Sequence, residues 1–551
     1  MADFNDLAEL MFPDVSETVD DLEKRFPERN LPEGAQVTRF APSPTGFLHT
    51  GSLFTSLVGY TYAKQSNGVF MFRLEDTDTK RTIAGSGDEL IDQLANFGIV
   101  ADEGYWPDGD RGNYGPYQQS KRASIYRTVI KHLVQQGKAY PDFCSAEDLE
   151  KIRAYQEANK ILPGYYGEFA RDRNLTPDEQ IARIKAGEPY VVRYRSNGNH
   201  NNKTSFVDAI RGKIEIMEND VDVVILKGDG LPTYHFAHVV DDHFMRTTLV
   251  SRGEEWISST PIHLDLFRAL GWKTPKYAHL PVIMKLDNGN KRKLSKRKDA
   301  EAAVSYFIKE GYPTKGLLVY LMNIANSNFE DWTIANKDYD ISHFKFSFSK
   351  MSLDGALFDI DKLAYFCKEV IAREKKDTLL PKIKAWAKDN DEKLYKLIDE
   401  DPEYIGKIID IEKDRPNPRK DFAKYSDILP MRRFFFEEDF AEIKASGLPF
   451  NEKYDKDFIK TFLSDCASGM LYDVDESTWW NGVKELASSH GFATNNKEYK
   501  ANPDAWKGNI ADAAELIRVA ITGSKNAPNL HEVIDILGKE RVIARLNSAI
   551  A

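Results

Sequence analysis

Apolar and polar residues alternate with two different periods, and the changes of period mark the expected elements. QVTRFAP and VFMFRLED have the short apolar runs of strands, and GSLFTSLVGYTYAKQSNG between them has the pattern of a helix that ends at a glycine. This order predicts two neighbouring parallel strands. The pattern returns near Gly230, with TTLVSRG, a helix from STPIHLDLFRALG, and HLPVIM.

A mixed region separates these two sections. It contains a long helical pattern, SKRASIYRTVIKHLVQQG, and strand patterns at PYVVRYRS and VDVVILKG. After about Lys375 the pattern is mostly helical and rich in Lys, Asp and Glu. The sequence therefore predicts a split α/β domain with an insert, followed by a helical C-terminal region.

Residues 1–35 are an acidic extension. Val15, Val19, Leu22 and Phe26 have helical spacing, and PERNLPEG then breaks the pattern. The segment carries ten acidic and three basic side chains, so it accounts for seven of the chain's net eleven negative charges. A short helical docking arm and a poorly ordered tail are both compatible with this composition.

Length and composition restrict the class of protein. A chain of 551 residues predicts three or more domains, and 42% hydrophobic with 29% charged residues is typical of a soluble globular protein. No apolar run approaches the roughly 20 residues of a membrane helix, and the acidic start does not resemble a secretory signal. The three cysteines are far apart and fit a reducing compartment. We expect a cytoplasmic protein without a membrane partner.

The segment RFAPSPTGFLHTGSL (Arg39–Leu53) leads from a strand through a loop into a helix. Such a junction directs backbone N–H groups and the positive end of the helix dipole at one point, where phosphates bind well. Gly46 and Gly51 allow a ligand close to the backbone, and His49 offers a hydrogen-bond donor. A rigid turn with a surface histidine is the alternative interpretation.

A second segment is strongly basic, with six basic residues among the eight of KRKLSKRK (Lys291–Lys298). A cationic loop suits the charge that develops on a triphosphate attacked at its α-phosphorus. A solvated basic loop is the alternative. Because local patches decide nucleic-acid binding, the net charge of −11 does not exclude RNA.

Two further segments carry charged groups that suit a small ligand. The three carboxylates of FRLEDTD (Phe72–Asp78) could hold a metal, bind an ammonium group or cap a helix. In the segment Leu226–Trp256, Arg252 follows a strand and could bind a carboxylate with both branches of its guanidinium group; a surface salt bridge is the alternative.

Taken together, these motifs resemble those of the bacterial-type glutamyl-tRNA synthetases, which are class I aminoacyl-tRNA synthetases. RFAPSPTGFLHTGS resembles the first signature of the family and KLSKR the second, and FRLEDTD, GPYQQSKR, DGLPTYHFAHVVDDH and RGEEW resemble further segments in the family's order. The resemblance begins near Gln36, is clearest to about Leu363, and recovers in RVAITGSKNAPNLHEVIDILGKERVIARL.

The resemblance implies an α/β fold with a split Rossmann-like parallel-sheet catalytic domain. The expected segments are the acidic extension (1–35), the first Rossmann half (36–115), an inserted acceptor-stem-binding domain (116–230), the second Rossmann half (231–287), the KLSKR loop with a stem-contact region (288–375), and an all-helical anticodon-binding region (376–551).

The resemblance also implies a two-step reaction. Glutamate attacks the α-phosphorus of ATP to give glutamyl-adenylate and pyrophosphate, and the terminal ribose of tRNA(Glu) then takes the acyl group. In this family the first step needs bound tRNA. The implied partners are tRNA(Glu), L-glutamate and ATP, and Mg²⁺ is expected to accompany ATP. The sequence shows no dedicated protein cage for this ion, which suits one held largely by phosphates and water. A monomer is expected.

Site residues follow from the resemblance by motif position. The catalytic residues are His49 and Gly51 at the ATP phosphates, with Lys293 and Lys296 on the pyrophosphate side of the transition state. The ATP site comprises Thr45, His49, Gly51, Glu255, Trp256, Val282, Ile283 and Lys296. The glutamate site comprises Arg39, Ala41, Ser43, Glu75, Tyr234 and Arg252, in which the arginines hold carboxylates and Glu75 the α-ammonium group.

The sequence departs from the family pattern in two places within the motifs. Thr50 stands where the first signature has isoleucine, and Ser52 stands where many class I enzymes have a second histidine. Some members bind zinc through a Cys-x-Cys pair, but PDFC offers only Cys144, with Asp142 in the partner position. Since a zinc site needs about four ligands, we predict no metal site.

Several other functions compete with this interpretation. A glutaminyl enzyme usually has PEPNG where this chain has PSPTG, and Arg252 favours an acid over an amide. A non-discriminating glutamyl enzyme, which also charges tRNA(Gln), stays open. The long helical region argues against a short tRNA-modifying relative and a small-molecule nucleotidylyltransferase. A non-catalytic RNA-binding descendant is expected to have lost His49, Lys293 or Lys296.

Overall fold

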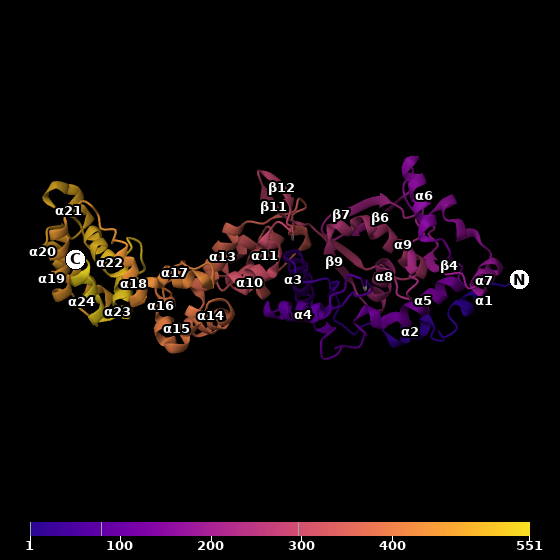
Figure 1. The fold of residues 1–551 in the computed structure, drawn as a ribbon, viewed down its shortest axis with the longest axis horizontal. Coiled ribbons are helices and arrows are strands. Elements are labelled where there is room, and N and C mark those ends of the chain that lie inside the picture. Colours follow the sequence, from indigo (N-terminus) through magenta and orange to yellow (C-terminus); the bar gives the residue numbers. More distant parts are fainter. Residues whose placement is uncertain (1, 79, 296, 551) are drawn as a thin grey trace. The chain divides into compact units, whose positions relative to one another are not determined.

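The computed structural model describes residues 2–78, 80–295 and 297–550. The chain divides into two compact units, and each is described by itself. The first unit comprises Met1–Tyr306 with Leu318–Asp359, and the second comprises Phe307–Leu317 with Ile360–Ala551. Figure 1 shows both units as ribbons and labels many of their elements.

The elements up to residue 359 include both helices and strands. In chain order they are α1 (Phe4–Met11), α2 (Val19–Arg25), β1 (Val37–Phe40), α3 (Thr50–Gln65), β2 (Val69–Phe72), α4 (Ser86–Asn96), β3 (Glu103–Gly104), α5 (Ala123–Gln135), β4 (Ala139–Asp142), α6 (Ala146–Ala158), α7 (Pro177–Lys185), β5 (Val191–Tyr194), β6 (Lys203–Asp208), β7 (Gly212–Met217), β8 (Val224–Leu226), α8 (Tyr234–Phe244), β9 (Leu249–Gly253), α9 (Thr260–Leu270), β10 (Lys276–Leu280), β11 (Ile283–Asp287), β12 (Asn290–Lys293), α10 (Val304–Glu310), α11 (Thr314–Ala325), α12 (Phe329–Ala335) and β13 (Ala356–Leu357).

Two parallel arrays form the centre of the first unit, as the sequence predicts for a split α/β domain. Strands β1, β2 and β3 form one array, and β9, β10 and β6 form the other, with β7 antiparallel at its edge. Next to β9, Thr248 N donates to the Val37 carbonyl on β1 over 3.0 Å, so the two arrays lie side by side. The α/β expectation is confirmed.

The predicted insert, residues 116–230, contributes to two sheets. Strands β4, β5 and β8 form an antiparallel sheet of their own. Strands β6 and β7 instead extend the second parallel array, where Asp208 on β6 is the register partner of Tyr277 on β10. The end of β6 therefore lies beside strands that follow the insert in the chain, and this placement matters for the site.

Helices α1 (Phe4–Met11) and α2 (Val19–Arg25) are part of the core of the first unit. Leu7, Leu22 and Phe26 are at most 1% exposed and share one hydrophobic cluster with Val129 on α5 and Phe244 on α8. The sequence left a helical arm and an unordered tail open, and the structure has the helices. Their apolar faces complete a core instead of remaining in solvent.

The second unit is mostly helical, as predicted. It contains α13 (Ile360–Arg373), α14 (Lys376–Asn390), α15 (Glu392–Glu400), α16 (Pro402–Asp410), α17 (Ile428–Arg432), α18 (Glu437–Ala445), α19 (Lys456–Gly469), α20 (Glu476–Ser489), β14 (Phe492–Ala493), α21 (Asn496–Ala501), β15 (Gly508–Asn509), α22 (Ile510–Thr522), α23 (Leu530–Leu537) and α24 (Lys539–Ser548). Strands β14 and β15 form a short parallel pair that the sequence pattern does not reveal.

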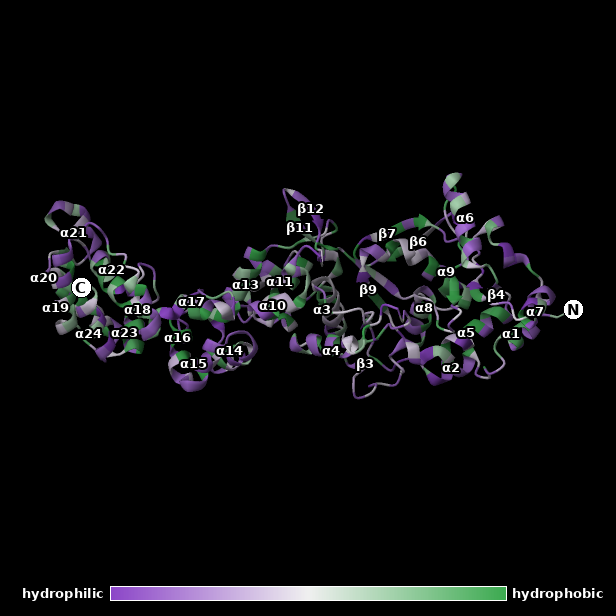
Figure 2. Cartoon of the chain, viewed as in Figure 1, coloured by the Kyte–Doolittle hydropathy of each residue, from purple (hydrophilic) through white to green (hydrophobic). Residues whose placement is uncertain are grey.

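The helices of both units carry hydrophobic and hydrophilic residues in alternation, green and purple in Figure 2. In the second unit the apolar side chains of α14, α19 and α22, such as Ile383, Phe462 and Leu516, are buried in one cluster. This is the packing expected of amphipathic helices. Among the described helices, none combines the length and the apolar character needed to cross a membrane.

Candidate active site

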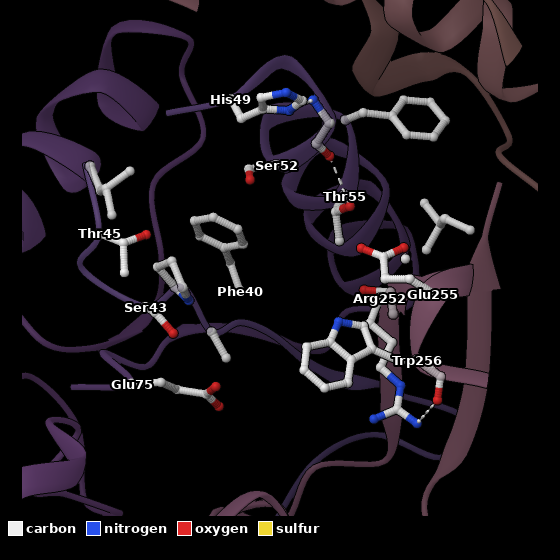
Figure 3. A pocket seen from close by; sticks show the side chains of 18 of the residues that line it. Phe40, Ser43, Thr45, His49, Ser52, Thr55, Glu75, Arg252, Glu255 and Trp256 are labelled. Carbon is white, nitrogen blue, oxygen red and sulfur yellow. Dashed lines mark hydrogen bonds between the residues drawn. The ribbon is translucent and has the colours of Figure 1, made fainter. Parts of the chain in front are cut away.

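The first unit contains a cavity of about 610 Å³ at the ends of its parallel strands, a volume in the range of small-molecule sites. Figure 3 shows the side chains around it. Lys296 lies outside the described residues; every other residue that the sequence predicts for the ATP and glutamate sites lines this cavity. These are Arg39, Ala41, Ser43, Thr45, His49, Gly51, Glu75, Tyr234, Arg252, Glu255, Trp256, Val282, Ile283 and Lys293.

The start of α3 forms one wall of the cavity. His49 is the N-cap of the helix, and its Nδ1 accepts a hydrogen bond from the Gly51 N–H over 3.0 Å. In a neutral imidazole the proton then resides on Nε2, which becomes a donor. A Cβ added at Gly51 would lie 3.2 Å from His49 Nδ1, so a side chain there would press on the imidazole. The glycine at position 51 therefore gives the His49 ring the space for this hydrogen bond.

Thr50 explains one departure from the family signature. Its side chain is buried, and the hydroxyl donates to the Glu301 carbonyl over 2.7 Å. Nearby, Val304 N donates to the Leu48 carbonyl over 3.1 Å. The start of α3 is thereby joined to the segment that follows KLSKR, through a bond that isoleucine could not make.

The basic segment Lys291–Lys298 begins on β12, which forms a hairpin with β11. Its basic side chains have different surroundings. Arg292 forms ion pairs with Asp287 and Asp299, at 2.7 and 2.6 Å. The hydrogen bond from Arg292, aided by the Ser295 N–H, holds the pKa of Asp299 well below its usual range. Lys293 instead lines the cavity with an exposed side chain. Arg292 therefore shapes the loop, while Lys293 is available to a ligand.

A network of buried ion pairs lies below the other end of the cavity. Arg39 pairs with Asp242 over 3.1 Å, and Arg73 pairs with both Asp242 and Glu75, over 2.7 and 2.8 Å. Beside them, Arg122 pairs with Asp241 over 2.6 Å. Three buried arginines are thus matched by three buried carboxylates.

Arg252, at the end of β9, is also buried, at 5% exposure, but its partners are neutral. Its Nε donates to His279 Nε2 over 3.1 Å, its Nη1 contacts His263 Nδ1 at 3.2 Å, and its Nη2 donates to Thr260 Oγ1 over 2.9 Å. Within the described part of the chain, no carboxylate lies within 4.0 Å of this guanidinium group. One buried guanidinium group is therefore left without a direct ion pair among the described residues.

The histidines around Arg252 are held neutral. Burial lowers the pKa of His263 well below its usual value, and the neighbouring His238, Arg252 and His235 lower it further. Burial also lowers the pKa of His279, although its hydrogen bond to Asp208 opposes the shift. Near neutral pH these two rings therefore add no positive charge beside Arg252.

Glu75 carries the negative charge of this end of the cavity. Its Oε1 accepts from Arg73, and burial raises the pKa of the carboxyl group against the attraction of Arg73 and Arg39. Figure 3 shows the Glu75 carboxylate and the Arg252 guanidinium reaching into the pocket from opposite sides. Near Arg252, Tyr234 packs on Trp256 with ring centroids 4.4 Å apart. The two charges and the aromatic pair define a small polar site.

The remaining wall combines backbone and apolar groups. Glu255 folds over Gly253, where an added Cβ would overlap its carboxylate. Val282 N donates to Glu254 Oε1 over 3.1 Å, and the buried Ile283 lies beside it.

Comparison with known proteins agrees with this geometry. A family model described as tRNA synthetases class I (E and Q), catalytic domain, matches residues 36–364. The chain belongs to this class I synthetase family. A model of an anticodon binding domain matches residues 505–550 of this synthetase.

Individual relatives match almost the whole synthetase. The glutamate–tRNA ligase of Clostridium perfringens strain 13 is 44% identical over 544 residues, covering 98% of this chain and all of that protein. The one of Clostridium beijerinckii is 45% identical over 546 residues, 99% of each chain. A crystal structure of a glutamate tRNA ligase from Elizabethkingia meningosepticum, in complex with its amino acid, has a TM-score of 0.71 at 28% identity and covers 94% of this chain and 99% of that chain. The resemblance noted in the sequence is confirmed.

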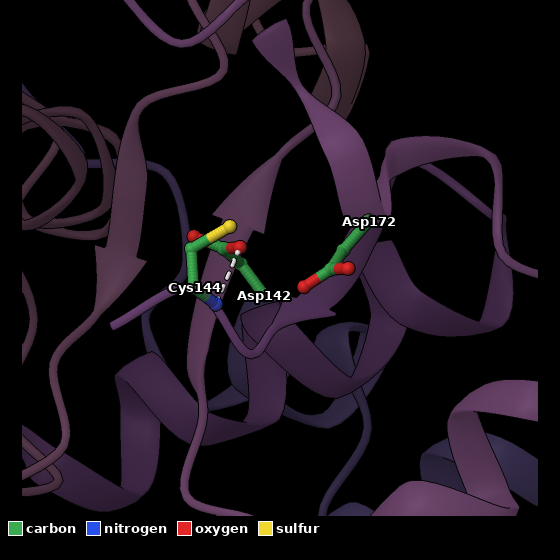
Figure 4. Close-up of side chains that lie close together, drawn as sticks. All are labelled: Asp142, Cys144 and Asp172. Carbon is green, nitrogen blue, oxygen red and sulfur yellow. Dashed lines mark hydrogen bonds between the residues drawn. The ribbon is translucent and has the colours of Figure 1, made fainter. Parts of the chain in front are cut away.

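Asp142 and Cys144, which stand where some relatives have a zinc-binding Cys-x-Cys pair, form a cluster with Asp172 in this synthetase. Their ligand atoms and those of Asp172 lie within 4.8 Å of one another (Figure 4). The Asp142 carboxylate already pairs with Arg193 and accepts from the Tyr165 hydroxyl and Cys144 N–H, at 2.5, 2.8 and 3.1 Å. With one thiol and a guanidinium group against a carboxylate, this donor set does not fit the usual zinc site.

Assigning site residues by their position in the family motifs did not identify several buried polar residues beside the synthetase site. His263, His279 and Asp208 support Arg252 from behind the cavity and belong to no signature. The strand pattern of HLPVIM indicated that His279 lies on a strand. No pattern in the sequence predicted that Asp208, 71 positions earlier, contacts it.

Proposed function

We propose that this chain ligates L-glutamate to tRNA(Glu), using ATP and passing through glutamyl-adenylate. The observation that carries the proposal is the buried Arg252, whose charge has no carboxylate partner among the described residues, opposite Glu75 in one cavity. Free glutamate has two carboxylates and one ammonium group, a net charge of −1. It would supply the missing negative charge at Arg252 and an ammonium group for Glu75. The names of the relatives support the same activity.

In this proposal each glutamate group has its own partner. Arg252 binds one carboxylate with the branches of its guanidinium group, as arginine does where planar recognition is needed. Arg39, with Ala41 and Ser43 nearby, approaches the other carboxylate, and Glu75 accepts the α-ammonium group. Tyr234 closes the pocket. With the side-chain carboxylate of glutamate at Arg252, the amide of glutamine in the same place would leave Arg252 without a direct ion pair, which disfavours glutamine.

The nucleotide would lie along the other side of the cavity. His49 donates from Nε2 to a phosphate oxygen, and Gly51 leaves room at the N-terminus of α3, with Thr45 close by. Glu255 and Trp256 face the ribose, and Val282 and Ile283 the adenine. Mg²⁺ enters with ATP, held largely by phosphates and water.

The chemistry that follows has two steps. An α-carboxylate oxygen of glutamate attacks the α-phosphorus of ATP, a phosphorus–oxygen bond forms, and the bond to pyrophosphate breaks. Negative charge grows on the departing phosphates, where Lys293 and Lys296 stabilise it. A ribose hydroxyl of the tRNA end then attacks the acyl carbon, and AMP leaves with the bonding electrons.

Finer properties belong to the same proposal. We expect a cytoplasmic monomer that holds no zinc. The helical region from residue 376 onward, whose end matches an anticodon binding domain, would contact the anticodon. A non-discriminating enzyme that also charges tRNA(Gln) differs only in how that region reads its tRNA.

Aminoacylation of purified tRNA(Glu) and tRNA(Gln) with labelled glutamate tests the proposal, with labelled glutamine as the control. Glutamate on tRNA(Glu) alone is the expected result. Glutamate on both tRNAs would establish the non-discriminating alternative. Charging of neither tRNA, or charging with glutamine, would contradict the proposal.

A further inference from the structure

We propose that Asp208 and His279 form a relay that orients Arg252 for carboxylate binding without placing a carboxylate directly against its guanidinium group. The inference rests on the proposed function, because it concerns how the glutamate pocket selects an acid. Neither residue is among the described residues that line the cavity, and both are buried. They are therefore positioning residues that act through Arg252.

The relay runs across three neighbouring parallel strands. Asp208 ends β6, His279 lies on β10, and Arg252 lies on β9. His279 and Arg252 are direct register partners, so their side chains leave the sheet on the same face. Strand β6 belongs to the segment predicted as an insert, and none of its residues lies in a family motif. Through Asp208, a residue of this insert therefore helps to orient a side chain of the glutamate pocket.

The Asp208 carboxylate, the first group of the relay, is held by four hydrogen bonds. Its Oδ1 accepts from the backbone N–H groups of Ile210 and Arg211, at 2.9 and 3.0 Å. Its Oδ2 accepts from both N and Nδ1 of His279, at 3.0 and 2.8 Å. Burial opposes ionisation of this carboxyl group, but the hydrogen bonds from His279 and the two backbone groups outweigh it and lower its pKa. An ionised Asp208 can only accept hydrogen bonds.

This acceptor fixes the tautomer of His279. Since Nδ1 must donate to Asp208, the neutral ring has its lone pair on Nε2, which accepts from Arg252 Nε over 3.1 Å. The ring also stacks on Tyr277, with centroids 5.6 Å apart and planes 11° apart. Both the direction and the acceptor character of Nε2 are thereby set.

A second histidine holds the other side of the guanidinium group. His263 Nδ1 lies 3.2 Å from Arg252 Nη1, and its Nε2 lies 3.1 Å from Nδ1 of His235. If His263 donates from Nε2 to His235, its Nδ1 is an acceptor as well. Arg252 is thus held at two points by neutral rings.

Neutral acceptors distinguish Arg252 from its neighbours. Arg39 and Arg73 are both paired with Asp242, whose negative charge neutralises much of theirs. A carboxylate in the position of His279 would orient Arg252 equally well, but it would compete with the substrate for the same charge. A buried unpaired charge is unfavourable, so the site binds an anion strongly and a neutral amide weakly. The relay supplies orientation without a direct ion pair.

Substitutions in the relay test this inference by aminoacylation kinetics. Asp208→Asn can donate to Nδ1 and favour the other tautomer, which removes the acceptor for Arg252. We expect the KM for glutamate to rise about tenfold, the scale of one hydrogen bond to a charged group, with the KM for ATP unchanged. His279→Gln, whose side-chain oxygen can accept, should lose less than His279→Ala.

A further variant separates orientation from charge. His279→Glu places a carboxylate against Arg252, so we expect the preference for glutamate over glutamine to fall by tenfold or more, whereas in His279→Gln it should be kept. Glu215→Gln, an exposed carboxylate on the adjacent β7, is the matched control and should leave both KM values unchanged.

Four outcomes are informative. Unchanged glutamate KM in Asp208→Asn and His279→Ala would overturn the relay, as would equal increases in the KM values for glutamate and ATP. If His279→Ala does not fold, as judged by thermal unfolding, His279→Gln and His279→Glu decide by their selectivity ratio. Failure of the unmodified protein to charge any tRNA with glutamate would instead contradict the proposed function, and glutamate binding by calorimetry would then test the relay.

Discussion

The Thr50 hydroxyl donates a 2.7 Å hydrogen bond to the backbone carbonyl of Glu301, and this bond joins the start of α3 to the segment after the basic loop. Both residues lie in the first unit, in which His49 and Lys293 line the cavity. A threonine that looks like a departure in the first signature therefore links that signature to the segment after the second.

Replacing Thr50 by valine keeps the shape of the side chain and removes the link. We expect the turnover number to fall about threefold to tenfold with little change in the glutamate KM, and the free energy of unfolding to fall by about 1 kcal/mol. Steady-state aminoacylation and thermal unfolding measure both effects. Thr128→Val on α5, which also loses a hydroxyl-to-carbonyl bond, should lose similar stability without the change in turnover.

Arg252 offers the most direct test of acid recognition. Arg252→Lys keeps a positive charge but loses the planar fork, and Arg252→Ala loses both. We expect the glutamate KM to rise by roughly tenfold and at least a hundredfold respectively, because a charge-assisted pair of hydrogen bonds is weakened or lost. The ATP KM should stay near its normal value. A near-normal glutamate KM in Arg252→Ala would refute the assignment.

The sequence predicted the residues of the cavity better than the contacts behind it. His49, Gly51, Glu75 and Arg252 stand in short motifs that resemble those of the family, and this resemblance, not local order, assigned them to one site. The relay from Asp208 to His279 depends on β6 pairing with β10 across 71 positions, and no local pattern encodes that register. Long-range strand pairing is where the sequence is least informative.

The packing of the N-terminal extension (residues 1–35) was also not predictable from local sequence patterns. Helical spacing from Val15 to Phe26 predicted a helix, but not whether it would find a partner. The partner is a face of α5 and α8 that is far away in the chain, and only the folded core reveals it.

Lys296 belongs to the second signature, and its expected role comes from the resemblance. Its charge would act mainly in the transition state, so Lys296→Ala should lower the rate of adenylate formation by at least tenfold with little effect on glutamate binding. Lys291→Ala, at an exposed position outside KLSKR on β12, is the control. Unchanged turnover in Lys296→Ala would exclude that role.

Phe26 tests whether the extension is part of the core. Its ring is 1% exposed and lies 5.7 Å from that of Phe244 on α8, measured between centroids. Phe26→Ala should lower the free energy of unfolding by about 3–5 kcal/mol, the usual cost of a deleted buried phenyl ring. Chemical denaturation of the full chain measures this cost. Tyr155→Ala, at a ring that is 58% exposed, should change stability by less than about 0.5 kcal/mol.

Glu23 on α2 gives that core a pH dependence. Its carboxylate lies 2.7 Å from His243 Nε2 and 2.6 Å from Arg246 Nη2, at the end of α8. Burial opposes ionisation, but the hydrogen bonds from Arg246 and His243 outweigh it and lower the pKa of Glu23 below 4.5.

A carboxyl group whose pKa is lower in the folded state stabilises the fold above its unfolded pKa, and the stabilisation disappears as the pH falls through the folded pKa. Glu23→Gln should therefore cost about 1 kcal/mol at pH 7, a figure kept small because solvent screens a side chain that is one-third exposed. The cost should shrink as the pH falls below about 4.5. Denaturation of both proteins between pH 3.5 and pH 7 measures it. A difference in stability that stays constant over this range would show that the charge of Glu23 does not stabilise the contact.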